Sequence, residues 1–163
     1  MKKLSLLLLF SSLLVSSLAA QVEVTFQNPE KYRDIEYGEG RVERGIKIYL
    51  PMLEKFITQQ AKRYLEDGQH LSIVFSDIDL AGEYEPWRRI EYQDIRIVKS
   101  IYPPLMVFNY ELTDSDGNVI KSGEERLLDL TFEYRPRISF HDDLFYEKEM
   151  LKDWFHTLKR KSD

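Results

Sequence analysis

The sequence predicts an α+β domain, with a largely antiparallel sheet and two amphipathic helices packed on one of its faces. Residues 46–65 and 144–158 each carry one apolar stripe at helical spacing. Several other segments alternate apolar and polar residues, as strands with one buried face do. Because each helix has one side to bury, both are expected on the same face of the sheet, which leaves the other face to solvent or a partner. The expected order is β-α-β-β-β-β-α.

Length and composition exclude several classes of protein. The chain has 163 residues, of which 43% are hydrophobic, enough for the core of one domain. Its 23 basic and 28 acidic side chains give a net charge of −5, which argues against general nucleic-acid binding. The absence of cysteine excludes disulfides, zinc ribbons, thiol nucleophiles and lipid attachment at cysteine. We expect neither a cofactor nor a metal ion.

The first nineteen residues have the pattern of a secretory signal peptide. Lys2 and Lys3 precede a leucine-dominated run, and small residues follow it at positions 17–20. The run is short for a membrane span, which needs about 20 predominantly apolar residues. We therefore expect cleavage after Ala19 or after Ala20. The remainder, residues 20–163, would be a single α+β domain in the periplasm with no stable membrane span.

The first strand and the first helix follow from local patterns. Val22, Val24 and Phe26 alternate with polar residues and predict a strand. Residues 28–45 are charged and contain several glycines, which indicates a mobile surface loop. The helix over 46–65 contains Pro51, and an interior proline loses a backbone hydrogen bond. Either the helix begins near Pro51 or its first turn is bent there.

The central strands include one predicted irregularity. The apolar residues of 71–75 and those of 78–80 have opposite parity, so a strand through both must change face near Ser76 and Asp77, as a bulge allows. A short strand is expected over 94–99. The strand 106–112 and the segment 119–132 flank a polar turn and predict a hairpin.

The last helix is expected to begin after the acidic pair Asp142 and Asp143. Either residue can cap it, and the cationic residues 159–161 suit its carboxyl end.

The densest cluster of polar and aromatic residues lies in segment 77–89. It holds four carboxylates, two aromatic side chains and two guanidinium groups. Such a set could form an acid pair, a cation site or a surface that stacks on a sugar. Alternatively the aspartates brace the bulge, Trp87 folds over the sheet, and Arg88 or Arg89 pairs with an acid. The candidate cluster, functional or structural, comprises Asp77, Asp79, Glu83, Glu85, Trp87 and Arg88.

No other motif assigns a catalytic or metal-binding residue. The turn 114–118 resembles part of a calcium loop, but counting back from Gly117 places Leu112 at the first ligand position, so a tight turn explains it. Ser122 lacks the glycines of a nucleophile elbow. The three histidines have no spacing that suggests a catalytic triad.

Four strings of residues carry a resemblance to a known family. They are 77–88 (DIDLAGEYEPWR), 94–98 (DIRIV), 122–127 (SGEERL) and 146–155 (YEKEMLKDWF), and the opening segment 24–30 (VTFQNPE) adds to them. Together they resemble the domain-of-unknown-function family 3016. The resemblance implies an exported protein of Gram-negative bacteria, and it implies no activity or catalytic residue. The predicted architecture is also similar to small envelope-assembly modules such as the lipoprotein that plugs the lipopolysaccharide translocon, although this chain has no cysteine for a lipid anchor.

Two hypotheses about function follow. The first is a non-enzymatic binding or envelope-assembly module with an envelope protein as its partner. The alternative is a carboxylate-dependent hydrolase of envelope glycans that uses two of the acids in segment 77–89. Acids that converge in a concave pocket would favour the enzyme, whereas acids tied to backbone amides on a convex surface would favour the module.

Overall fold

Four strands form the main sheet of the protein. A computed structural model describes residues 20–38, 40–137 and 142–160. The sheet has the order β1 (Gln21–Phe26), β2 (His70–Asp79), β5 (Leu105–Thr113) and β6 (Val119–Leu128). β1 runs parallel to β2, and the other neighbours are antiparallel. The predicted α+β class with a largely antiparallel sheet is confirmed.

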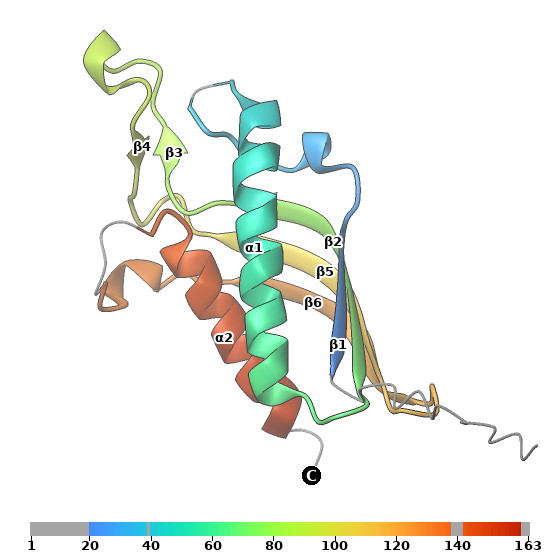
Figure 1. The fold of residues 1–163 in the computed structure, drawn as a ribbon. Helices are drawn as coiled ribbons and strands as arrows, with labels where there is room; N and C mark the ends of the chain where they lie inside the picture. Colours follow the sequence, from blue (N-terminus) through green and yellow to red (C-terminus); the bar gives the residue numbers. More distant parts are fainter. Residues whose placement is uncertain (1–19, 39, 138–141, 161–163) are drawn as a thin grey trace, which may run out of the picture.

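Two helices, α1 (Val42–Tyr64) and α2 (Phe145–Arg160), cover the same face of this sheet (Figure 1). The core lies between them and the strands, as expected. Its central side chains are Leu53, Ile57, Ile73, Phe75, Phe108, Leu151, Trp154 and Phe155. Phe26, Phe56 and Tyr110 are half-buried around this core.

The face of the sheet opposite the helices is polar. Asn109 and Glu111 of β5 lie opposite Glu124 and Ser122 of β6, and all four side chains are exposed. This is the alternation expected of an antiparallel sheet with one wet face.

The bulge is confirmed in β2, where the register with β5 shifts between Phe75 and Asp77. Beyond the shift, Ile78 points into the core while Asp77 and Asp79 lie on the other side of the strand. The chain therefore places the two aspartates at the end of the sheet without burying either of them in the core.

A two-stranded extension leaves the sheet after β2. We call residues 83–101 the arm. It contains β3 (Glu83–Tyr84), β4 (Arg96–Ile97) and the 3-10 turn η2 (Ile90–Tyr92) near its tip. Figure 1 shows the arm projecting beyond the edge of the helices and the main sheet. The predicted element order lacked β3, because two residues are too few to show a period of two.

The prediction of a mobile loop over residues 28–45 is wrong. The 3-10 turn η1 (Pro29–Lys31) lies there, and Tyr32, Asp34 and Ile35 are buried. The Tyr32 hydroxyl donates a hydrogen bond to the carbonyl oxygen of Phe75. Residues 28–45 therefore have the composition of a surface loop, although three buried side chains anchor the segment to the fold.

Helix α1 starts at Val42, four residues before its predicted start, and Pro51 lies inside it on an exposed position. Neither the proline nor the preceding glycine, Gly45, ends the helix. Gly45 is required for close packing, because a Cβ atom there would lie 1.6 Å from the carbonyl oxygen of Ile35.

The remaining connections agree with the sequence in part. Asp114 accepts hydrogen bonds from the backbone amides of Asp116 and Asn118, which makes the predicted tight turn. β6 ends at Leu128, and the 3-10 turn η3 (Phe132–Tyr134) follows it. Asp142 accepts a hydrogen bond from the amide of Leu144 immediately before α2, so one of the two predicted caps is in place.

The expected signal segment, residues 1–19, lies outside the described residues. Within the described ranges, neither helix combines the length and apolar character that a membrane crossing requires.

Candidate functional site

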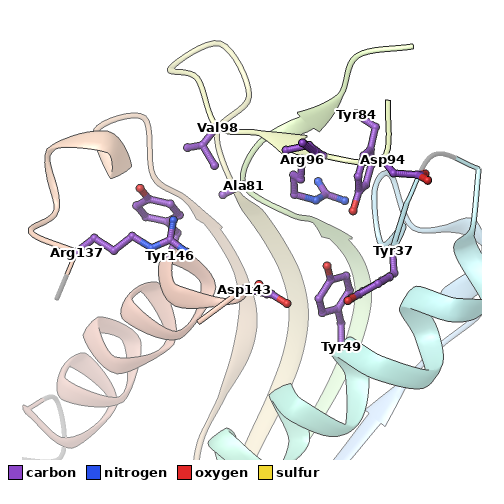
Figure 2. Close-up of a pocket in the computed structure, with 11 residues that line it drawn as sticks. Tyr37, Tyr49, Ala81, Tyr84, Asp94, Arg96, Val98, Arg137, Asp143 and Tyr146 are labelled. Carbon is purple, nitrogen blue, oxygen red and sulfur yellow. The ribbon is translucent and has the colours of Figure 1, made fainter. Parts of the chain in front are cut away.

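A half-open cleft of about 320 Å³ lies where the arm meets α1 and the beginning of α2. Figure 2 shows Tyr84 and Arg96 of the arm on one side, together with Tyr37 and Tyr49, and Tyr146 and Arg137 on the other. Side chains from several distant segments therefore meet here. The polar and aromatic ones are Tyr37, Tyr49, Tyr84, Asp94, Arg96, Arg137, Asp143 and Tyr146.

A buried ion pair fixes the arm to the segment before α1. Arg96 donates from Nη1 to Oδ2 of Asp34 at 2.5 Å and from Nη2 to Oδ1 at 2.9 Å. Its two terminal nitrogens also donate to the carbonyl oxygens of Gly82 and Glu36, both at 2.9 Å. Burial opposes the charge of Arg96, but the hydrogen bonds and charge of Asp34 outweigh it and raise the pKa of the guanidinium. This bidentate geometry sets the direction in which the arm leaves the fold.

A second group of charged side chains surrounds Glu85 near the root of the arm. Its carboxylate accepts hydrogen bonds from Arg88 Nε at 2.5 Å, from Lys99 Nζ, and from the Tyr102 hydroxyl at 3.2 Å. The hydrogen bonds from Lys99 and Arg88 lower the pKa of Glu85 to about 2. Glu85 therefore stays ionised at neutral pH and cannot serve as a general acid.

The other three predicted acids lie at the end of β2 and the start of β3. Asp77 accepts a hydrogen bond from the amide of Arg33 at 3.0 Å and pairs with its Nε at 2.9 Å. Asp79 and Glu83 both line a smaller cavity of about 180 Å³ outside the cleft. Burial, reinforced by the charge of Asp34, raises the pKa of Asp79 to about 6 and that of Glu83 above its usual value.

The predicted cluster is thus divided among three environments. Asp77 braces the bulge, Asp79 and Glu83 share the small cavity, and Glu85 and Arg88 pair at the root of the arm. The expected pairing of Arg88 with an acid is confirmed.

The expectation that Trp87 folds over the sheet is wrong, because its side chain is 71% exposed. Trp87 follows the two-residue strand β3, at a point where the arm has already left the main sheet (Figure 1). No core surface lies beneath it there.

Glu147 is a buried acid that the sequence analysis did not single out. Its side chain is on the inner face of α2 and its residue is 1% exposed. Oε1 accepts a hydrogen bond from the amide of Ala81 at 2.7 Å, and Oε2 has no partner among the described residues. Burial raises the pKa of Glu147 to about 7. A signal was available, because positions 144, 147 and 151 share one helical face and an acid stands there between two leucines.

The pairing of Asp34 with Arg96 was also missed, and here the sequence offers no signal. The two residues are 62 positions apart, and Asp34 sits in a segment whose composition indicates a loop.

The chain belongs to the family described as protein of unknown function (DUF3016), whose model matches residues 20–157. The resemblance noted from the sequence is therefore confirmed. No curated protein matches the sequence. The family description assigns no activity, and the geometry of the arm and the cleft is what bears on function.

Proposed function

We propose that this protein is an exported, non-enzymatic binding module of the Gram-negative envelope, which acts in the periplasm by docking its arm on a protein partner. The observation that carries the proposal is the concentration of exposed apolar side chains on the arm. The export step is supported by the signal-peptide pattern of residues 1–19.

The arm exposes more large apolar side chains than the rest of the described structure. Eleven such side chains are exposed among the described residues, and six of them belong to the arm. Ile90 is 84% and Trp87 71% exposed. The six are Trp87, Ile90, Tyr92, Ile95, Val98 and Ile101. Exposed apolar clusters rimmed by polar residues mark interaction surfaces, and tryptophan and tyrosine are frequent anchors of protein interfaces.

The arm is also held in one direction before any partner binds. Asp34, which lies outside the arm and is nearly inaccessible to solvent, accepts two hydrogen bonds from Arg96. Glu85, within the arm and also nearly inaccessible, binds Lys99 on the returning segment and accepts a hydrogen bond from the Tyr102 hydroxyl at the root. A surface fixed in this way loses less conformational freedom on binding, which increases affinity. The arrangement suits a docking element better than an adaptable loop.

The hydrolase hypothesis has less geometric support. An acid and a base must be held apart in one cleft and have different pKa values. Of the four acids in segment 77–89, Glu85 and Asp77 are engaged in ion pairs, and Asp79 and Glu83 face a common cavity. That cavity, at about 180 Å³, is small for a glycan chain.

Affinity capture from periplasm with two matched double variants tests the proposal. The first, Trp87→Ala with Ile90→Ala, removes the two most exposed apolar groups of the arm's distal part. The control, Leu130→Ala with Tyr134→Ala, removes side chains that are 67% and 86% exposed outside the arm. We expect the wild type and the control to capture the same protein and the arm variant to lose it, with unchanged melting temperatures.

Equal capture by all three proteins would contradict docking through the arm. Cleavage of peptidoglycan by the purified protein, abolished by Asp79→Asn or Glu83→Gln without a change in melting temperature, would establish the hydrolase instead.

A further inference from the structure

We infer that the cleft at the root of the arm is a binding site for a sugar, specifically one ring of a neutral oligosaccharide. The site lies at the root of the arm and does not include Trp87 or Ile90, but two of its lining residues, Ile95 and Val98, are also among the exposed apolar side chains of the arm. The inference depends on the size of the cleft, the balance of its charges and the kinds of side chain that line it.

The cleft is large enough to take one sugar ring. Its volume of about 320 Å³ is at the lower end of the range found for small-molecule sites. It is formed by the arm, α1 and α2 together, so a ligand would contact elements that are remote in the sequence (Figure 2).

The charges in the cleft favour a neutral ligand. Two arginines, Arg96 and Arg137, and two aspartates, Asp94 and Asp143, line the cleft. Both terminal nitrogens of Arg96 already donate to Asp34 and to backbone carbonyls, and its Nε is buried without a partner among the described residues, so this guanidinium has little capacity for a further anion. Asp94 pairs with Arg41 at 3.2 Å, and the carboxylate of Asp143 would repel an anionic group. A metal ion has no support here, because no group of three metal-ligating acids or histidines occurs among the described residues.

Hydrogen-bonding groups of both kinds line the cleft. Asp143 is exposed, makes no side-chain hydrogen bond or ion pair with another described residue, and points toward Tyr49 in Figure 2. The Tyr49 hydroxyl has Tyr84 as a hydrogen-bonding neighbour, and burial raises its pKa, so it remains protonated at neutral pH. A carboxylate accepts from a ligand hydroxyl, and a phenol can both donate and accept. Sugar hydroxyls also do both.

The walls of the cleft offer apolar surface against which the C–H faces of a sugar ring can pack. Tyr37 and Tyr146 are half-buried, with part of each side chain accessible on opposite sides of the cleft (Figure 2). Ala81, Ile95 and Val98 complete the lining. Tyrosine rings combine apolar area with a polar tip, and this combination suits a ligand that is apolar on its faces and polar at its edge.

Nuclear magnetic resonance titration of the protein purified after expression of the full chain tests the inference. The probes are a β-1,4-linked N-acetylglucosamine tetramer and maltotetraose, with citrate as the anionic comparison. We expect at least one oligosaccharide to produce saturable shifts at the amides of Ala81, Ile95 and Val98. The expected Kd is on the order of 0.1 to 1 mM, as befits a shallow polar site.

Asp143→Ala is the diagnostic variant, because its side chain is exposed and its loss should leave the fold intact. We expect it to weaken binding by about tenfold, which corresponds to about 1.4 kcal/mol. Asp67→Ala, an exposed aspartate in the turn after α1, is the matched control and should bind as the wild type does.

Three results would overturn the inference. They are the absence of saturable shifts with both oligosaccharides up to about 10 mM, shifts that Asp143→Ala leaves unchanged, and binding of citrate without binding of either sugar.

Discussion

Replacing Glu147 with glutamine is expected to stabilise the protein at alkaline pH and to have little effect at acidic pH. Burial raises the pKa of this carboxyl from 4.5 to about 7 in the folded protein. The folded state therefore binds this proton more tightly than the unfolded state does. Between pH 4.5 and about 7 the free energy of unfolding consequently falls as the pH rises, and above that range the loss is complete.

The size of the effect follows from the same pKa values. A rise from 4.5 to about 7 corresponds to about 3 kcal/mol, at about 1.4 kcal/mol per pH unit. Glutamine is neutral throughout and keeps an oxygen that can accept the Ala81 amide hydrogen bond now made by Oε1. The variant therefore resembles the protonated wild type, and its free energy of unfolding should not fall as the pH rises.

Urea denaturation at pH 4.5 and pH 8 measures the difference. We expect Glu147→Gln and the wild type to have similar free energies of unfolding at pH 4.5, and the variant to be more stable by about 3 kcal/mol at pH 8. Glu149→Gln, on the same helix but ion-paired with Lys152 near the surface, is the control and should show no such divergence. Parallel pH profiles for wild type and Glu147→Gln would refute the reasoning.

Four further predictions concern the core, the packing of α1, the root of the arm and the amino terminus. Trp154→Ala should cost about 3–5 kcal/mol of stability, whereas Lys159→Ala, exposed on the same helix, should cost almost nothing; equal melting temperatures would mean that α2 is peripheral. Gly45→Ala should destabilise the protein by roughly 1–3 kcal/mol in urea denaturation, because the added methyl group would overlap a backbone oxygen. Amides 80–82 all donate hydrogen bonds within the fold, so hydrogen exchange there should be slow, and complete exchange in the dead time would exclude a rigid root. Intact mass of periplasmic extract should give a chain that begins at residue 20 or 21, and a full-length mass in the membrane fraction would contradict export.

The sequence predicts those parts of the fold in which the apolar or polar character of each residue indicates whether its side chain is buried or exposed. Parity within residues 71–80 located the bulge to within one residue of Ser76, because side chains of a strand alternate between faces. Apolar spacing identified both helices for the same reason. Such patterns fail where a segment covers no more than one period, as in the two-residue strand β3.

Sequence patterns also fail where a residue's position depends on contact with a residue that is distant in the sequence. Asp34 is buried together with its partner Arg96, which comes from the arm. A charged residue in a polar, glycine-containing stretch has the local signature of a loop, whatever its eventual partner. Glu147 is a different case, since its position within an apolar stripe was visible, and only the size of its pKa shift required the structure.

The distribution of buried charge explains how so small an arm keeps its orientation. β3 and β4 pair over only two residues each, and the tip of the arm has no core of its own. Burying an ion pair costs several kcal/mol of desolvation, so apolar contacts between the same two surfaces would stabilise the fold more. Apolar contacts are non-directional, however, whereas the bidentate bond between Asp34 and Arg96 permits only one geometry. Three acids, Asp34, Glu85 and Glu147, are nearly fully buried. Asp34 bonds to Arg96 of the arm and Glu147 to Ala81 just before it, whereas Glu85, itself in the arm, bonds to Lys99 on the returning segment. The buried ion pair therefore fixes the direction of the arm at a cost in stability. This is expected if the arm presents Trp87 and Ile90 to a partner at a fixed angle.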